Sequence, residues 1–541
     1  MKKIILFPLL FLMAVLCMYA CKKSSVELFN PAREFTPGSL SVASNGDTSV
    51  TISWKKSVNS AAGLTYTVQI ATDTTFATPV LSFVTASTSV LVTDDSLADR
   101  QKYYVRVMAN QNSASANSYW IVDMSGFSFA GMQIFKTLTS NNIIDVAAIL
   151  SWTTTPGVSK IVLTAPNGDT TQVPITDAVN TAGQIQINDL KPNTKYSAEI
   201  YAGTKSMGLE TFTTQASVTG ANIIDLRSVP DAGDPNILMD TLPVIPAGST
   251  VLLQQGMTYN ITANYTFTQT VTIMSGLGFS TPAVIALGSQ NFDASGNIDS
   301  IRFANVIFAT DANGAASYIF NISQATTINT LTFENCTTQG NFGNSLLRLK
   351  SSGQTINNLV IDNCVIDSIG IGQKYALIYP DASGAIINNI SITNSTFYYI
   401  DYFIREDDLP KPNSATVTVS NCTFNNFLAN SGYIFEANSG VPAALNFNNC
   451  IFGGTNMPTA ADGIKAASNP VFSNCYMTSD CTFSSNSLTS FVGSGLTQLS
   501  VSSTSLFTNP SATPPNLTLQ SSSSVTSSST GVTAGDPRWI P

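Results

Sequence analysis

The 541-residue sequence contains no histidine, and charged residues make up only 11% of it. Without histidine, the usual general base at neutral pH and the commonest zinc ligand are both missing, so any catalysis must use carboxylates, Lys, Arg or Tyr. The formal net charge of −9 gives no electrostatic basis for binding nucleic acid or an anionic membrane surface. We therefore expect no nucleic-acid partner and no firm metal site.

Long apolar runs are also scarce, except at the N-terminus. Two lysines precede an apolar stretch from Ile4 to Val15, and small or neutral residues lead to Cys21. This order is typical of a bacterial secretory signal and is too short for a good transmembrane span. The stretch "CMYAC" resembles a lipobox, which implies that Cys21 is acylated; an ordinary signal with an incidental cysteine is the alternative. We predict a lipoprotein signal peptide over residues 1–20, a linker over 21–36, and membrane contact through the lipid alone.

Ser, Thr, Asn and Gly are abundant, which favours an all-β architecture rich in strands and turns. From about Pro37, short alternating strands are separated by turn signals, and Trp54 ends one of them. Leu97 precedes Tyr103 by six residues in a later strand. This pattern resembles the buried tryptophan and the tyrosine corner of a fibronectin type III sandwich. We predict such a domain over residues 37–138.

The pattern then occurs a second time. Trp152 again ends a strand, and Leu190 again precedes Tyr196 by six residues. An Asn167-Gly168 pair between two strands suits a hairpin turn. We predict a second fibronectin type III-like sandwich over residues 139–217, with both modules serving as spacers or interaction surfaces.

A strand followed by Asn and then Cys or another small residue recurs throughout the second half of the chain. The asparagines are Asn305, Asn335, Asn363, Asn394, Asn421, Asn449 and Asn474. Successive spacings are 30, 28, 31, 27, 28 and 25 residues. Repeats of this length with β-type alternation are typical of a parallel β-helix, which we predict over residues 218–541 with a C-terminal cap.

Stacking of the coils explains why an amide and a thiol stand side by side in this repeat. Equivalent residues form columns at about 4.8 Å per coil, so each Asn can hydrogen-bond to the turn backbone and to the Asn of the next coil. A buried amide left unpaired would cost about 1–3 kcal/mol, so only a repeated column makes it tolerable. Cβ atoms at the coil spacing are too far apart for disulfides, which favours free packed thiols.

The stretch "IPAGSTVLLQQGMTYNI" at residues 245–261 resembles the opening of pectate-lyase-like domains. The segment from residue 505 to the Gly-Asp-Pro-Arg-Trp motif at 535–539 resembles the last coil and cap of bacterial β-helix proteins. The resemblance implies a right-handed, pectin-lyase-like parallel β-helix whose final segment is ordered.

A second strand occurs once per coil, and it offers an outer face. Alignment of Ile319, Leu347, Leu377, Ile404, Ile434 and Ile464 as inward residues predicts an outer column of Phe320, Arg348, Ile378, Arg405, Phe435 and Lys465. Lys350 and Asp407 lie two residues further on. Basic side chains that alternate with apolar rings suit a polysaccharide, because sugar rings stack on apolar faces and Arg binds carboxylates bidentately.

The stretch "FYYIDYFIREDDLPKP" at residues 397–412 is the densest mixture of tyrosine, acid and base in the chain. We predict that it projects from one coil as a loop and that Tyr399 and Tyr402 contact the same ligand.

Two further readings of the outer column stay open. One strand resembles the strand of alginate- and chondroitin-type lyases that carries their catalytic Arg, which would make Arg348 or Arg405 that residue and Lys350 a base. A lyase of this kind would also use calcium. However, Glu406, Asp407 and Asp408 are consecutive and face different ways, and the paired acids of a glycosidase are not evident. The other reading is a structural or adhesive protein.

Two sandwiches ahead of a β-helix, behind a lipobox, resemble Bacteroidetes cell-envelope lipoproteins of glycan-utilisation systems. The resemblance implies an outer-membrane lipoprotein that binds polysaccharide, with other glycan-utilisation surface proteins as partners. We expect it at the cell surface. A periplasmic orientation stays open as the alternative, because Lys22 and Lys23 follow Cys21, whereas surface display usually follows an acidic run.

Overall fold

The computed structural model describes residues 33–59, 61–111, 115–220, 222–229, 231–314, 316–371, 375–406, 415–428, 432–437, 442–466 and 469–541. The chain divides into two compact units, Met1–Gln215 and Ala216–Pro541. The predicted signal peptide, Cys21 and Asp407 lie outside the described residues. No helix among the described residues is long and apolar enough to cross a membrane.

The first unit begins with a sandwich of two antiparallel sheets. One sheet contains β1 (Gly38–Ser44), β2 (Ser49–Lys55) and β5 (Ser89–Thr93). The other contains β4 (Leu81–Thr85), β3 (Tyr66–Ala71), β6 (Tyr103–Ala109) and β7 (Ile121–Phe127). Burial alternates along β2 and β6, as expected when one face of each strand packs on the core.

A second sandwich follows in the same unit. Its sheets contain β8 (Ala148–Ser151) and β11 (Gln184–Ile187), and β10 (Thr170–Pro174), β9 (Val158–Thr164), β12 (Lys195–Ala202) and β13 (Lys205–Thr213). The short helices are η1 (Ser140–Asn142) and α2 (Asp177–Ala182).

Both sandwiches have the side-chain contacts that their sequence pattern predicts. Trp54 and Trp152 are buried in their respective cores. The Tyr103 hydroxyl accepts a hydrogen bond from the Ala98 backbone amide at 2.9 Å, and Tyr196 accepts one from Lys191 at 2.9 Å. These bonds back to the preceding chain are the tyrosine corner of this sandwich class.

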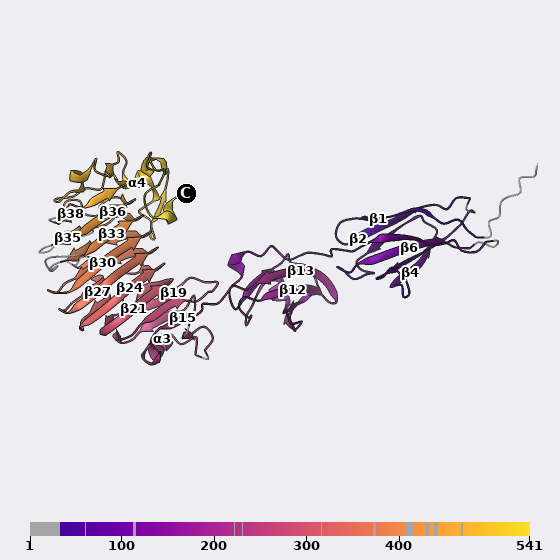
Figure 1. The fold of residues 1–541 in the computed structure, drawn as a ribbon, viewed down its shortest axis with the longest axis horizontal. Helices are drawn as coiled ribbons and strands as arrows, with labels where there is room; N and C mark the ends of the chain where they lie inside the picture. Colours follow the sequence, from indigo (N-terminus) through magenta and orange to yellow (C-terminus); the bar gives the residue numbers. More distant parts are fainter. Residues whose placement is uncertain are drawn as a thin grey trace, which may run out of the picture. The chain divides into compact units, whose positions relative to one another are not determined.

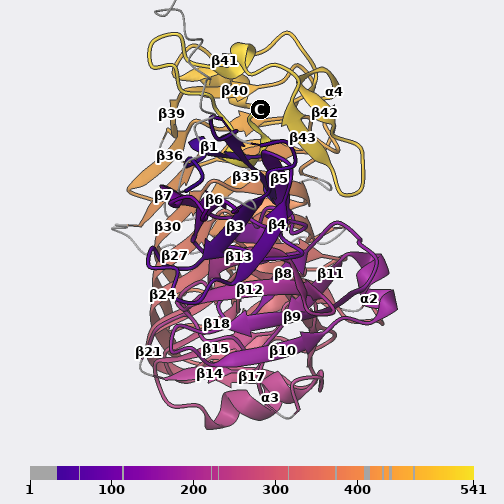
Figure 2. The same ribbon diagram turned by 90° about the vertical axis from the view of Figure 1, so that its right-hand side faces the viewer.

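The second unit is a parallel β-helix of three sheets, which we call the first, second and third sheets (Figures 1 and 2). The first sheet contains β14 (Ile223–Asp225), β15 (Ser249–Leu253), β18 (Val271–Ser275), β21 (Gly296–Ala304), β24 (Thr326–Glu334), β27 (Gln354–Asp362), β30 (Ile386–Thr393), β33 (Thr416–Ser420), β36 (Ala444–Asn448) and β39 (Val471–Ser473). The second contains β16 (Thr258–Ile261), β19 (Ala283–Leu287), β22 (Val306–Thr310), β25 (Thr337–Gln339), β28 (Val365–Ile369), β31 (Thr396–Ile400), β34 (Thr423–Asn425), β37 (Ile451–Phe452), β40 (Cys475–Met477) and β41 (Leu496–Gln498). The third contains β17 (Tyr265–Phe267), β20 (Phe292–Ala294), β23 (Tyr318–Ile322), β26 (Ser345–Leu349), β29 (Ala376–Pro380), β32 (Tyr402–Glu406), β35 (Tyr433–Ala437) and β38 (Asp462–Lys465).

Shorter elements lie at the two ends of the β-helix. Figure 2 shows α3 at one end and α4, β42 and β43 at the other. These elements and the remaining short helices are α3 (Ile237–Thr241), η2 (Leu242–Val244), η3 (Leu488–Phe491), α4 (Ser503–Leu506), β42 (Phe507–Asn509), β43 (Asn516–Leu519), η4 (Ser523–Val525) and η5 (Pro537–Trp539).

The interior is apolar from coil to coil. In the first sheet Leu331 pairs with Leu359 and Phe333 with Ile361, and all four side chains are fully buried. The cysteines that follow the asparagines are buried in the same core and are free thiols. The expected packing of unpaired thiols is therefore what the structure contains.

The seven repeated asparagines occupy one corner, directly after strands of the first sheet. Each has a left-handed backbone, with φ between 49° and 54°, and Asn tolerates this conformation better than most residues. In five of the six steps, the side-chain amide of one Asn donates to the amide oxygen of the preceding one at 2.9–3.2 Å. We call this column the asparagine ladder.

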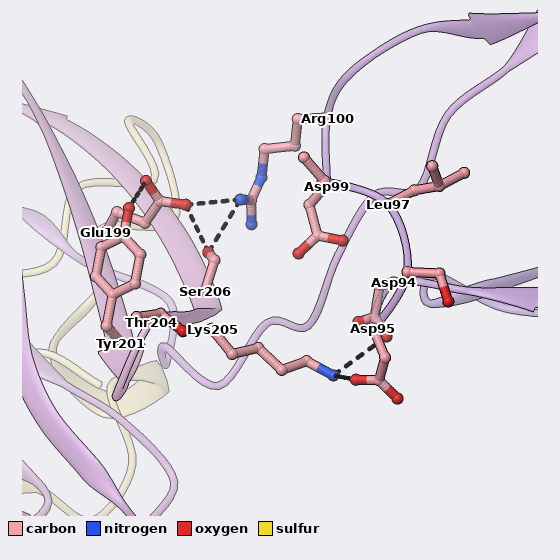
Figure 3. Close-up of a pocket in the computed structure, with 12 residues that line it drawn as sticks. Asp94, Asp95, Leu97, Asp99, Arg100, Glu199, Tyr201, Thr204, Lys205 and Ser206 are labelled. Atoms are coloured by element: carbon pink, nitrogen blue, oxygen red, sulfur yellow. Dashed lines mark hydrogen bonds and ion pairs between the residues drawn. The ribbon is translucent and has the colours of Figure 1, made fainter. Parts of the chain in front are cut away.

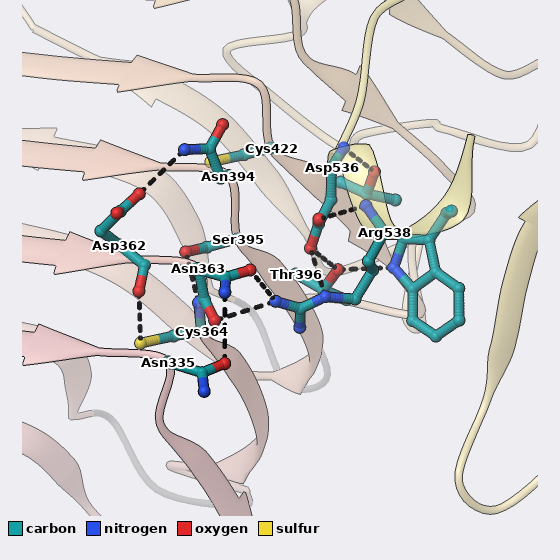
Figure 4. A network of polar contacts seen from close by, with 12 residues as sticks. Asn335, Asp362, Asn363, Cys364, Asn394, Ser395, Thr396, Cys422, Asp536 and Arg538 are labelled. Carbon is teal, nitrogen blue, oxygen red and sulfur yellow. Dashed lines mark hydrogen bonds and ion pairs between the residues drawn. The ribbon is translucent and has the colours of Figure 1, made fainter. Parts of the chain in front are cut away.

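The ladder is interrupted once, and the C-terminal segment fills the gap (Figure 4). Asn394 donates to the Asp362 carboxylate at 2.9 Å instead of to Asn363. The side-chain oxygen of Asn363 instead accepts a hydrogen bond from Arg538 at 2.6 Å. Arg538 thus supplies the donor that the next asparagine does not provide.

The rest of the C-terminal segment packs on the outer face of the second sheet. Leu506, Phe507, Leu517 and Leu519 form a small core with Ile451 and Tyr476, which point outward from that sheet. The segment from residue 499 to 541, which we call the cap, is therefore ordered, as the sequence resemblance implied.

Candidate functional site

The outer face of the third sheet holds the basic residues that the sequence singled out. Arg348, Arg405 and Lys465 lie in one outward column, with Tyr379 opposite Arg348 and Glu436 between Arg405 and Lys465. Their strands belong to neighbouring coils, so the column runs along the axis of the β-helix.

The predicted apolar members of this column are wrong. Phe320, Ile378 and Phe435 point inward and are fully buried in the main core. Each strand from β23 to β35 of the third sheet has an apolar doublet here, such as Ile319-Phe320, and both members are buried. Because burial does not alternate across the doublet, alternation alone cannot set the register. When the strands are aligned on the second residue of each doublet, the polar residue that follows it faces outward in every strand.

Tyrosines take the place of the expected apolar rings. The face comprises Tyr318, Tyr375, Tyr379, Tyr402 and Tyr433 together with Arg348, Arg405 and Lys465. We call it the Tyr–Arg face. The sequence had a usable signal for it, since a Tyr stands at the start of β23, β32 and β35.

The cationic groups lie over tyrosine rings. The Arg348 guanidinium carbon is 5.1 Å from the centre of the Tyr375 ring and 5.7 Å from that of Tyr318. The Arg405 guanidinium carbon is 5.1 Å from the centre of the Tyr379 ring. Such contacts within about 6 Å are attractive and hold both partners in place.

Acidic residues complete the face. Arg348 donates to the Asp381 carboxylate through Nε at 2.8 Å and to the Tyr318 hydroxyl through Nη1 at 3.0 Å. Glu436 lies 3.3 Å from Arg405 and 3.0 Å from Lys465. The cations are therefore fixed by pairing, and the face carries little net charge.

The hydroxyls of Tyr318, Tyr402 and Tyr433 stay protonated at neutral pH. Burial raises the pKa of Tyr318 and Tyr402, and burial with the neighbouring Asp462 raises the pKa of Tyr433 to about 12. A general base is most effective with a pKa near the working pH, so these tyrosines are poorly suited to proton abstraction.

Three other predicted site features, the stretch from Phe397, Tyr399 and Lys350, are placed as follows. The part of the predicted loop at residues 397–406 belongs to strands β31 and β32, because Phe397 and Phe403 anchor both strands in the core, and residues 407–412 lie outside the described residues. Tyr399 belongs to β31 of the second sheet, so it is on a different sheet from Tyr402. Lys350 lies just beyond β26 and is exposed.

The described residues contain no group of three or more acidic or cysteine side chains arranged to hold a metal ion. The structure therefore adds no support for the calcium that a lyase would use.

A cavity of about 580 Å³ lies within the first unit (Figure 3). Most of its charged groups bond to one another: Arg100 contacts Glu199 at 3.0 Å and Lys205 contacts Asp95 at 2.6 Å, whereas Asp99 has a buried oxygen without a hydrogen-bond partner among the described residues. Burial and Glu199 raise the pKa of Tyr201 to about 12. Tyr201 is the one aromatic residue among the described residues that line this cavity, so the cavity offers less stacking surface for a ligand than the Tyr–Arg face.

The fold and this face define an all-β protein in which two sandwiches precede a β-helix with an aromatic, ion-paired surface. Residues 19–114 match the model described as SusE outer membrane protein. Residues 257–400 and 417–539 match two domains of unknown function, DUF4957 and DUF5123, and both ranges lie within the β-helix unit. The N-terminal part of the chain is thus similar to an outer-membrane protein.

No curated protein matches the chain. Among solved structures, a two-domain fibronectin type III segment of chicken tenascin is 14% identical, with 34% of this chain and 99% of that one covered and a TM-score of 0.18. The FN1–FN3 domains of chicken CNTN1 are 15% identical, with 34% and 68% covered and a TM-score of 0.15.

Proposed function

We propose that this protein binds polysaccharide along the Tyr–Arg face of its β-helix, as an outer-membrane lipoprotein of a glycan-utilisation system. The observation that carries the proposal is the row of five tyrosines with three cations along one sheet. The SusE match over residues 19–114 supports the location and the association with other glycan-utilisation surface proteins.

The face has the dimensions and chemistry of a polysaccharide site. Tyr318 and Tyr433 are on strands four coils apart, which corresponds to roughly 19 Å at the usual strand spacing. Tyr318, Tyr375 and Tyr433 are partly exposed and offer planar apolar surfaces for sugar rings, whereas Tyr379 and Tyr402 are buried and support the cations. Arg has five N–H donors, and the contacts of Arg348 to Asp381 and Tyr318 leave donors for sugar hydroxyls or carboxylates.

The cationic side chains of the face are held in place without a ligand. The side chains of Arg348 and Arg405 are only 16% and 23% exposed, and each is held by an acid and by tyrosine rings. A ligand that meets fixed side chains loses less free energy to ordering them. Because of these ion pairs, a sugar carboxylate would have to compete with Asp381 for Arg348 and with Glu436 for Arg405.

Affinity gel electrophoresis of the full chain tests the proposal. The gels contain polygalacturonate, alginate, chondroitin sulfate, amylopectin, galactomannan or arabinoxylan. We expect at least one polymer to retard the parent protein, and Arg348→Ala and Arg405→Ala to weaken that retention by about tenfold, because each removes a hot-spot side chain. Arg302→Ala is the matched control, since Arg302 pairs with Glu334 at 2.7 Å on the first sheet.

Equal retention of the parent and both variants would rule out the Tyr–Arg face as the binding site. The same polymers are followed for a rise in ultraviolet absorbance. Unsaturated products would instead establish the lyase reading, in which Arg348 or Arg405 acts in β-elimination.

A further inference from the structure

Beside the small core in which the cap packs on the second sheet, a groove runs between other parts of the cap and the outer face of that sheet. One cavity of about 450 Å³ has a floor from β25, β28 and β31 and walls from the cap. The floor is formed by Thr337, Val365, Asp367 and Tyr398, and the walls include Pro514, Pro515 and Trp539. This groove is on a different sheet from the Tyr–Arg face.

A second cavity of about 340 Å³ continues the groove toward the last coils. Tyr398 lines both cavities. Beyond it the lining is polar and includes Asn425, Asn426, Asp480 and Ser503. The groove therefore has an apolar, aromatic half and a hydrogen-bonding half that meet at one tyrosine.

The walls of the groove are fixed to the sheet. The Trp539 indole N–H donates to the Thr396 hydroxyl at 2.7 Å, and that hydroxyl donates to the buried Asp536 carboxylate at 2.7 Å (Figure 4). These bonds hold Trp539 against the strand that carries Tyr398. The groove is thus preformed, as ligand pockets commonly are.

The backbone beside Tyr398 is strained. Tyr399 has φ of 50°, a left-handed conformation that is uncommon for a bulky residue. Ser368 and Asn426, its neighbours in the adjacent coils, are also left-handed. Strain of this kind persists where the surrounding structure demands it, often at binding sites.

The charge of the groove selects among ligands. Among the described residues that line the two cavities there is no Lys or Arg, whereas Asp367 and Asp480 are both present. A carboxylated or sulfated chain would meet only negative charge. An uncharged chain of sugar rings could stack on Tyr398 and Trp539 and hydrogen-bond to the Asn, Asp and Ser groups.

We infer that the groove under the cap is a second binding site and that it takes a neutral oligosaccharide segment. It goes beyond the function proposed for the Tyr–Arg face and does not depend on it.

Titration of the full chain with amylopectin, galactomannan, arabinoxylan and mixed-linkage β-glucan tests the inference by calorimetry. We expect at least one neutral polymer to bind, and Tyr398→Ala to weaken that binding by about tenfold. Val365→Trp, which fills the groove, should have the same effect. Tyr119→Ala is the matched control, because Tyr119 is 70% exposed on the first sandwich, and it should bind as the parent does.

Circular dichroism melting must give each variant the parent's midpoint, and Val365→Trp keeps the test usable if Tyr398→Ala does not fold. Undiminished neutral-polymer binding by the folded groove variants, or no binding of any of the four polymers, would overturn the inference. Arg348→Ala separates the two proposals: loss of neutral-polymer binding there, with full binding by Tyr398→Ala, places the ligand on the Tyr–Arg face alone.

Discussion

At the scale of single residues, Glu406 is the most unusual side chain in the β-helix. It ends β32, pairs in register with Ala437, and is fully buried. Neither carboxyl oxygen has a hydrogen-bond partner among the described residues. Burial raises the pKa of Glu406 to about 8, so the carboxyl is mostly protonated at neutral pH.

This raised pKa predicts a stability that falls with pH. The folded protein holds a proton on Glu406 that the unfolded chain, with a pKa near 4.5, releases. The stabilisation is complete below pH 4.5 and is lost as the pH rises toward 8, with a slope of at most about 1.4 kcal/mol per pH unit. Thermal melts of the parent should therefore show a midpoint that decreases over this range. Glu406→Gln should flatten the profile, and an unchanged slope in the variant would assign the pH dependence elsewhere.

At the scale of elements, the first sheet and its corner were predictable because their signal is local. Each Asn follows a strand directly, and its left-handed φ and stacked amide are properties of that one position. The third sheet was predictable only in part. Arg348, Arg405 and Lys465 were placed outward, but the buried doublets displaced the register at Phe320, Ile378 and Phe435.

The groove was not predictable from sequence at all. Tyr398 and Trp539 are 141 residues apart and meet only because the cap folds back over the second sheet. The same fold-back brings Arg538 to the interruption of the asparagine ladder, a contact across 175 residues. The repeated sequence pattern gives no sign of either contact.

The Arg538 contact makes a prediction at this scale. Arg538→Ala removes the hydrogen bond to the exposed Asn363 and the ion pair with the buried Asp536 carboxylate at 3.4 Å, and loss of the latter should lower the free energy of unfolding by about 1–3 kcal/mol. Arg302→Ala breaks a half-exposed ion pair and should cost about 0–1 kcal/mol. Urea unfolding of the two variants and the parent gives the comparison. Equal costs would mean that Arg538 is only another surface charge.

At the scale of the whole molecule, the β-helix and the two sandwiches have separate cores, and this predicts that the β-helix and the sandwiches unfold in different calorimetric transitions. Trp152→Ala removes a side chain that is 1% exposed in the core of the second sandwich, and it should destabilise that sandwich by about 3–5 kcal/mol and leave the β-helix transition unchanged. Asn421→Ala breaks two ladder bonds and should lower only the β-helix transition. A shift of both transitions by either variant would show that the units unfold together.

In a β-helix most contacts link one coil to the next, so the coils behave as a one-dimensional chain of units that can unfold from either end. The ladder bonds fit this description, because each joins residues 25–30 positions apart. The hydrogen bond between Arg538 and Asn363 does not fit this description, because it links the cap to a coil near the middle of the β-helix. The last coils cannot open before this hydrogen bond breaks. The strands between Asn363 and Arg538 should therefore exchange their amide hydrogens together, in one cooperative opening, rather than one coil after another from the C-terminal end.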